Sequence, residues 1–129
     1  NPSSRDIQDL IVDDANGQTR VFDRMADMAD RWSETQNVGI VAGATFPDDL
    51  QALRTRHPEL HFLIPGVGAQ GGEVEQTTRA GMNEHGRGFL VNSSRGIIYA
   101  SSDPLVFERE ARRAAELLRD QINDALKSK

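Results

Sequence analysis

Residues 64–72 read Ile-Pro-Gly-Val-Gly-Ala-Gln-Gly-Gly and directly follow the strand-like run 61–63. Four of the last seven residues of this stretch are glycines. Glycine tolerates positive φ angles and lets a ligand come close to main-chain N–H groups. A strand that runs into such a loop, with a helix after it, is a common way of holding a phosphate group. The stretch therefore predicts a βα unit with an anion-binding loop.

A second strand-like run, residues 89–92, ends in Ser93-Ser94-Arg95-Gly96. Hydroxyl groups and a guanidinium are strong partners for a phosphate dianion. The carboxyl ends of parallel strands meet at one edge, where barrels and doubly wound sheets bind their ligands. Most of the thirteen arginines of the chain suit a solvated surface. Arg95 differs because it directly follows an apolar strand, and we expect it to contact a phosphorylated small molecule.

The hydrophobic pattern alternates between strands and helices. It predicts strands at 38–44, 61–65 and 88–92, helices at 21–32, 47–56 and 74–82, a long helix after Pro104, and a helical turn near Ile7 and Ile11. Strands that alternate with helices at short intervals indicate parallel βα units. The continuous apolar run 38–44 is typical of a strand that is covered on both faces. We expect a single α/β segment over residues 1–129.

Three parallel strands make an incomplete fold, because two sheet edges and the apolar strand faces lack cover. The chain has 129 residues, whereas a complete (β/α)8 barrel typically has about 250. The chain also begins without methionine. We therefore expect it to be part of a larger barrel and to be cut from a longer protein.

Composition excludes several function classes. The net charge of −5 argues against nonspecific nucleic-acid binding, which needs a basic face. The absence of cysteine excludes disulfides and thiolate nucleophiles. No apolar run reaches the ~18 residues of a membrane span, so we expect no membrane insertion and a cytoplasmic location. Lysine occurs only at Lys127 and Lys129, so this chain lacks a lysine for buried chemistry.

The remaining candidate residues have two readings each. The glycines either close a tight turn or bind a phosphate; the Gln70 amide, which can donate to a phosphate oxygen, favours the second. Pro65 can form an apolar wall against a ring. Thr45, after the first predicted strand, either caps that strand or faces the ligand. Ser93 and Ser94 have no histidine in fixed relation to them, which weakens a serine-nucleophile hypothesis. His57, His61 and His85 are expected at the surface, and no cluster has metal-ligand spacing, so we predict no metal site.

Three strings of the sequence resemble the orotidine 5′-monophosphate decarboxylase family. They are Val-Ala-Gly-Ala-Thr at 41–45, the glycine stretch at 64–72, and Val-Asn-Ser-Ser-Arg-Gly-Ile at 91–97. The Gly-Ala-Gln-Gly-Gly string is similar to that of a bacterial subgroup, and Asn1-Pro2 resembles the end of the family's Thr-Ser-Asn-Pro segment. The resemblance implies the C-terminal part of a (β/α)8 TIM barrel, about strands six to eight with their helices. It implies decarboxylation of orotidine monophosphate to uridine monophosphate without a metal or organic cofactor.

The resemblance also implies roles for individual residues. Gln70 and Arg95 would hold the substrate phosphate, assisted by N–H groups near Gly68 and Ser94, and Pro65 would lie near the pyrimidine. The family's catalytic Asp-x-Lys-x-x-Asp motif is absent from this sequence. We expect the catalytic residues upstream of Asn1, in the N-terminal part of the barrel, so that this chain alone is inactive. A homodimer is expected by family analogy.

Two alternatives stay open at this point. The chain could be a non-catalytic phosphate-binding half-barrel module whose partner supplies the rest. It could also belong to another phosphate-binding barrel enzyme, such as an isomerase or an aldolase-like enzyme.

Overall fold

The computed structural model describes residues 2–14, 17–68 and 73–127. The elements in chain order are η1 (Pro2–Ser4), α1 (Arg5–Gln8), β1 (Ile11–Asp14), β2 (Gly17–Arg20), α2 (Val21–Trp32), β3 (Gly39–Val41), α3 (Pro47–Arg56), β4 (His61–Pro65), α4 (Val74–Gly81), β5 (Phe89–Asn92), α5 (Ser94–Ile98) and α6 (Phe107–Lys127). No helix within these described ranges is long and apolar enough to cross a membrane.

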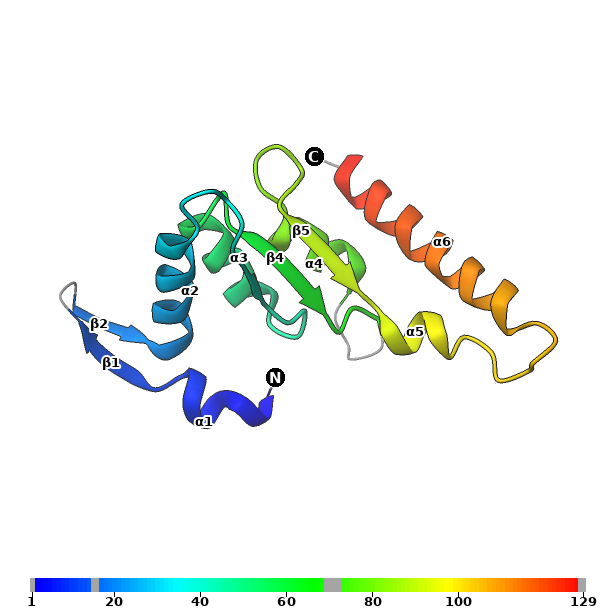
Figure 1. Cartoon of the computed structure of the whole chain (residues 1–129), viewed down its shortest axis with the longest axis horizontal. Helices are drawn as coiled ribbons and strands as arrows, with labels where there is room; N and C mark the ends of the chain where they lie inside the picture. The colour runs from blue at the N-terminus through cyan, green and yellow to red at the C-terminus, as the bar shows by residue number, and fades with distance from the viewer. Residues whose placement is uncertain (1, 15–16, 69–72, 128–129) are drawn as a thin grey trace.

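The main sheet consists of β3, β4 and β5 in that spatial order, and both pairs of strands are parallel. Parallel neighbours need a crossover connection, and α3 and α4 supply the two crossovers (Figure 1). Helix α3 begins at Pro47, where proline is tolerated, and has Asp48 and Asp49 in its first turn, where carboxylates favour the helix dipole. The predicted order of βα units is confirmed.

The core lies on one face of this sheet. Phe62 and Ile64 of β4 are fully buried against Leu50 and Leu53 of α3 and Ala80 of α4. Because side chains alternate between the two faces of a strand, the neighbours of these residues point the other way. The helices therefore cover only the face that carries Phe62 and Ile64.

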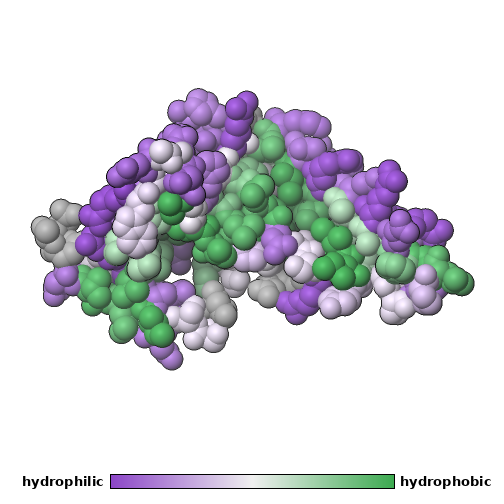
Figure 2. All heavy atoms as spheres, in the orientation of Figure 1, coloured by the Kyte–Doolittle hydropathy of each residue, from purple (hydrophilic) through white to green (hydrophobic). Residues whose placement is uncertain are grey.

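The opposite face of the sheet carries an apolar row that has no cover among the described residues. Val41, Leu63 and Leu90 are register partners across the three strands. Their exposed fractions are 69%, 39% and 71%. Figure 2 shows hydrophobic residues gathered over the middle of the molecule. The prediction that the first strand is covered on both faces is thus wrong for this chain, because no second layer packs on the described part of this face.

Arg54 of α3 is a buried cation at the end of the sheet where the strands begin. Its guanidinium donates at 2.8–3.0 Å to five main-chain carbonyl oxygens, those of His57, Pro58, Leu60, Gly81 and Gly88. Its guanidinium carbon lies 3.9 Å from the centroid of the Phe62 ring. Burial lowers the pKa of Arg54, and the charge of Glu59 opposes this shift. The side chain keeps its charge, since an arginine pKa starts far above neutral pH. Its hydrogen bonds connect the segment after α3, the end of α4 and the residue before β5.

His57 is also buried, so its predicted surface position is wrong. It caps the end of α3 and is only 4% exposed. Its Nδ1 lies 3.0 Å from an Asp30 carboxylate oxygen, within hydrogen-bond reach, and its Nε2 lies 3.2 Å from Asp27 Oδ1 without hydrogen-bond alignment. Both aspartates belong to α2, so His57 ties α3 to α2. His61 and His85 are exposed, as predicted.

The N-terminal segment departs from its prediction. Ile11 lies in a strand, β1, which pairs antiparallel with β2 in a hairpin. The expected helical turn is α1, which ends at Gln8. A further helix that the pattern did not predict, α5, begins at Ser94 directly after the third parallel strand.

Candidate functional site

The candidate site lies at the carboxyl ends of β4 and β5. Pro65 and Asn92, the last residues of these strands, are register partners. The chain after β4 then passes through Gly66 and Gly68, whose φ angles are +93° and +76°. Positive φ is strained for residues with a Cβ atom, so glycine is favoured for this backbone path.

A cavity of about 180 Å³ opens between the two strand ends. It is lined by Pro65, Gly66, Val67, Asn92, Ser93, Ser94 and Arg95. Val67 is only 1% exposed, so its side chain anchors this part of the chain in the core, and Gly66 before it also lines the cavity. The cavity is small, polar on the β5 side and apolar at Pro65.

Arg95 gives this cavity its charge. No acidic side chain is among the lining residues within the described part of the chain. Arg95 is exposed, and its guanidinium has no hydrogen-bond or ion-pair partner among residues 2–14, 17–68 and 73–127. The Ser94 hydroxyl donates to Asn92 Oδ1 at 3.3 Å. An unneutralised arginine beside hydroxyl groups is suited to an anionic ligand.

The structure brings together three of the six predicted site residues, Pro65, Ser94 and Arg95, around one cavity. Gly68 follows the lining residue Val67 but does not line the cavity itself. Thr45 lies at the same edge, since the amide of Ala44 donates to the Pro65 carbonyl at 3.1 Å, but it does not line the cavity either. Gln70 lies outside the described residues.

Asn92 is a lining residue that the sequence argument did not select. Its signal was available, because it is the last residue of a predicted strand and directly precedes the two serines. Its polar side chain shares the sheet face of Leu90, two residues earlier. No group of three or more histidine, aspartate or glutamate residues that could hold a metal ion is found in the described ranges.

Comparison with known proteins gives a consistent result. Residues 1–111 match the orotidine 5′-phosphate decarboxylase / HUMPS family. An orotidine 5′-phosphate decarboxylase of Halobacterium salinarum is 44% identical over 124 residues, which are 95% of this chain and 45% of that protein. The chain thus spans less than half the length of this curated relative.

Two solved structures show the same fold. The orotidine monophosphate decarboxylase of Leishmania donovani superposes with a TM-score of 0.79 at 36% identity, over 99% of this chain and 46% of that one. The decarboxylase of Methanocaldococcus jannaschii, solved with the inhibitor BMP, has a TM-score of 0.50 at 31% identity over 74% of this chain and 39% of that one. The parallel strands of this chain and their helices therefore correspond to a part of the TIM barrel of these enzymes. By sequence and by fold, the chain belongs to the orotidine 5′-phosphate decarboxylase / HUMPS family.

Proposed function

We propose that this chain forms the phosphate-binding part of an orotidine 5′-phosphate decarboxylase and corresponds to about strands six to eight of its barrel. The observation that carries the proposal is Arg95, an exposed guanidinium without a described partner at a cavity between two strand ends. A nucleotide phosphate would supply the missing negative charge. Ser94 would add a hydroxyl or N–H donor, and Pro65 would offer an apolar wall to the ring.

The glycine loop would complete the grip from the β4 side. Gly66 and Gly68 have positive φ angles, and N–H groups near Gly68 would approach a phosphate oxygen. Gln70 would add an amide donor, and the string Gly-Ala-Gln-Gly-Gly at 68–72 supports membership of the bacterial subgroup that carries it. Thr45 would face the ligand from the segment that follows β3.

The bond-breaking groups would come from the rest of the barrel. The described strands contain no lysine, and the two lysines of the chain are Lys127 and Lys129. Interactions with a remote phosphate can contribute to catalysis at a distant centre when they strengthen in the transition state. We infer that this chain alone binds but does not decarboxylate. Three further statements remain predictions. Residues 1–129 form one segment of the barrel domain, the protein is a homodimer, and it is located in the cytoplasm.

The test compares uridine monophosphate with uridine by titration calorimetry on the chain and on Arg95→Ala. Loss of the guanidinium should weaken monophosphate binding by about 10–100-fold, which corresponds to a charge-assisted contact of ~1.5–3 kcal/mol. Uridine binding should change much less. Equal losses for both ligands would remove Arg95 from a phosphate site.

Arg87→Ala is the matched control. Arg87 is an exposed arginine at the opposite end of the sheet, before β5 begins, so its loss changes net charge by the same amount. It should leave the affinity for uridine monophosphate nearly unchanged. Similar weakening by both substitutions would mean that only long-range charge is being measured.

A further inference from the structure

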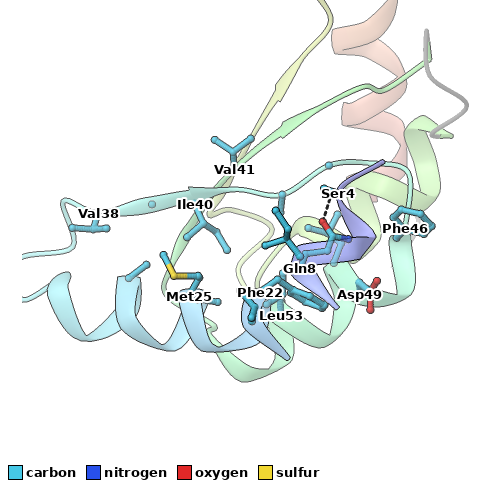
Figure 3. Close-up of a pocket in the computed structure, with 18 of the residues that line it drawn as sticks. Ser4, Gln8, Phe22, Met25, Val38, Ile40, Val41, Phe46, Asp49 and Leu53 are labelled. Carbon is cyan, nitrogen blue, oxygen red and sulfur yellow. Dashed lines mark hydrogen bonds between the residues drawn. The ribbon is translucent and has the colours of Figure 1, made fainter. Parts of the chain in front are cut away.

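Two cavities in the described part of the molecule differ in the polar groups that they offer. The larger, of about 620 Å³, lies between α2, β3 and the N-terminal residues Ser4, Ile7 and Gln8 (Figure 3). Its described lining is mainly apolar, and its one charged residue, Asp49, is already in an ion pair. The smaller cavity, at the strand ends, is lined by Asn92. Asn92 is a polar lining residue to which the proposed function gives no role.

The side chain of Asn92 stands beside Pro65. The two residues are register partners at the ends of β5 and β4, and neighbouring strands lie about 4.8 Å apart. Because side chains alternate between the faces of a strand, Asn92 shares the face of Leu90, and Pro65 shares the face of Leu63. Arg95 lies three residues beyond Asn92, in α5. Asn92 and Arg95 therefore border different parts of the same cavity.

The hydrogen bond between Ser94 and Asn92 fixes which end of the amide is free. The Ser94 hydroxyl donates to Asn92 Oδ1 at 3.3 Å. An asparagine side chain has one carbonyl acceptor and an NH₂ group with two donors. Asn92 is exposed, and its Nδ2 has no hydrogen-bond partner among residues 2–14, 17–68 and 73–127. The two N–H groups of Asn92 are thus the donors that this side chain can offer to a ligand.

We propose that Asn92 is a further ligand-binding residue, which donates from Nδ2 to a carbonyl oxygen of the pyrimidine ring, and that Ser94 is a positioning residue that orients its amide. The inference rests on the proposed function, in which the ring packs on Pro65 and the phosphate lies at Arg95. Asn92 stands beside Pro65, so its donors lie at the ring end of the cavity. An uncharged amide suits an uncharged carbonyl acceptor, whereas the guanidinium suits the phosphate dianion.

The test uses two ligands that share the phosphate and differ in the ring, uridine monophosphate and ribose 5-phosphate. Titration calorimetry measures the affinity of the chain and of Asn92→Ala for each. The substitution should weaken uridine monophosphate binding by about 3–10-fold, the net worth of one uncharged hydrogen bond. Binding of ribose 5-phosphate should change by less than about twofold. Equal weakening for both ligands would place the contact on the sugar or the phosphate and would overturn the proposal.

Asn92→Leu separates hydrogen bonding from packing. Leucine has a similar branched shape but no polar atoms, so this variant should lose as much affinity for uridine monophosphate as Asn92→Ala does. Retained affinity in Asn92→Leu would show that the side chain only fills space, which contradicts the proposal. Unchanged binding of ribose 5-phosphate by either variant also shows that the variant is folded.

Ser94→Ala tests the positioning role, because it removes the hydroxyl and keeps the main-chain N–H. Uridine monophosphate binding should weaken by about 2–3-fold, and ribose 5-phosphate binding should stay nearly unchanged. In the Asn92→Ala background the same substitution should have no further effect, since a group that acts through another is not additive with it. Additive losses would show that the hydroxyl contacts the ligand on its own, and would overturn the positioning role.

Arg95→Ala, measured with the same two ligands, separates this inference from the proposed function. It should weaken both ligands by the same factor, because both carry the phosphate. If Arg95→Ala weakens both ligands and Asn92→Ala weakens neither, the proposed function stands and this inference fails. If Asn92→Ala weakens uridine monophosphate alone and Arg95→Ala changes nothing, the ring contact is supported and the proposed phosphate site fails.

Discussion

The two ends of the parallel sheet each hold an arginine, and the two residues are used in opposite ways. Arg54, where the strands begin, is buried and donates to five carbonyl oxygens. Arg95, where the strands end, is exposed and has no described partner. An arginine whose three guanidinium nitrogens all donate to the main chain stabilises the fold, whereas one without such partners can bind a ligand. The contrast agrees with the division of barrels into a stability face and an activity face.

The largest effect on stability is expected from Arg54→Met, which tests whether the buried arginine of this comparison stabilises the fold. The substitution leaves several buried carbonyl oxygens without a donor, so the free energy of unfolding should fall by about 4 kcal/mol. Urea denaturation followed by circular dichroism measures this loss. Arg54→Lys keeps the charge with fewer donors, so its loss in the free energy of unfolding should be intermediate. An unchanged free energy of unfolding in Arg54→Met would show that the network adds no stability.

His57→Ala tests the same end of the sheet with a smaller expected effect. The imidazole is 4% exposed and contacts Asp27 and Asp30 of α2, so its loss should cost about 2 kcal/mol through the cavity and the lost polar contact. The same denaturation experiment applies. His85→Ala, at an exposed histidine, is the control and should change the free energy by less than about 0.5 kcal/mol.

Gly68→Ala moves the test to the ligand end. A Cβ atom at Gly68 would meet no heavy atom within 4 Å, so the cost arises from its φ of +76° alone. We expect a loss of about 1 kcal/mol in the free energy of unfolding. Gly68→Asn should lose less, because asparagine tolerates this region better. Equal losses for both variants would point to a cause other than backbone conformation.

The smallest effect on stability is expected from Arg95→Ala. An exposed side chain without a described partner should change the free energy of unfolding by less than about 0.5 kcal/mol. Combined with the expected 10–100-fold loss of monophosphate binding, this would place Arg95 wholly on the functional side. A loss of stability comparable to that of Arg54→Met would erase the contrast between the two ends.

Local patterns predicted much of this architecture. The strand over 61–65 and the helix over 21–32 match β4 and α2, because each has a strong periodic apolar face. The hairpin was missed because its strands are short and largely polar, so only its turn residues gave a signal. The role of Arg54 could not be predicted, since its acceptors Gly81 and Gly88 are far along the chain and converge only after folding.

Local patterns also predicted part of the candidate site, but not the contacts that form only in the folded chain. Pro65, Ser94 and Arg95 follow strands directly, so strand order alone places them at one edge. Asn92 was missed although its place was informative, because it ends a predicted strand and directly precedes the two serines. That Arg95 lacks a described partner is a tertiary fact, since it depends on which acidic residues fold near the cavity.

The acceptors of Arg54 also bear on how the chain folds. Three of them follow α3, one ends α4 and one precedes β5. A lone βα unit would bury this charge with only part of its hydrogen bonds, which is unfavourable. The network is completed only when two consecutive units have assembled. Arg54 therefore couples these units, so that their unfolding should be cooperative rather than sequential, with similar opening free energies for the amides of β4 and β5.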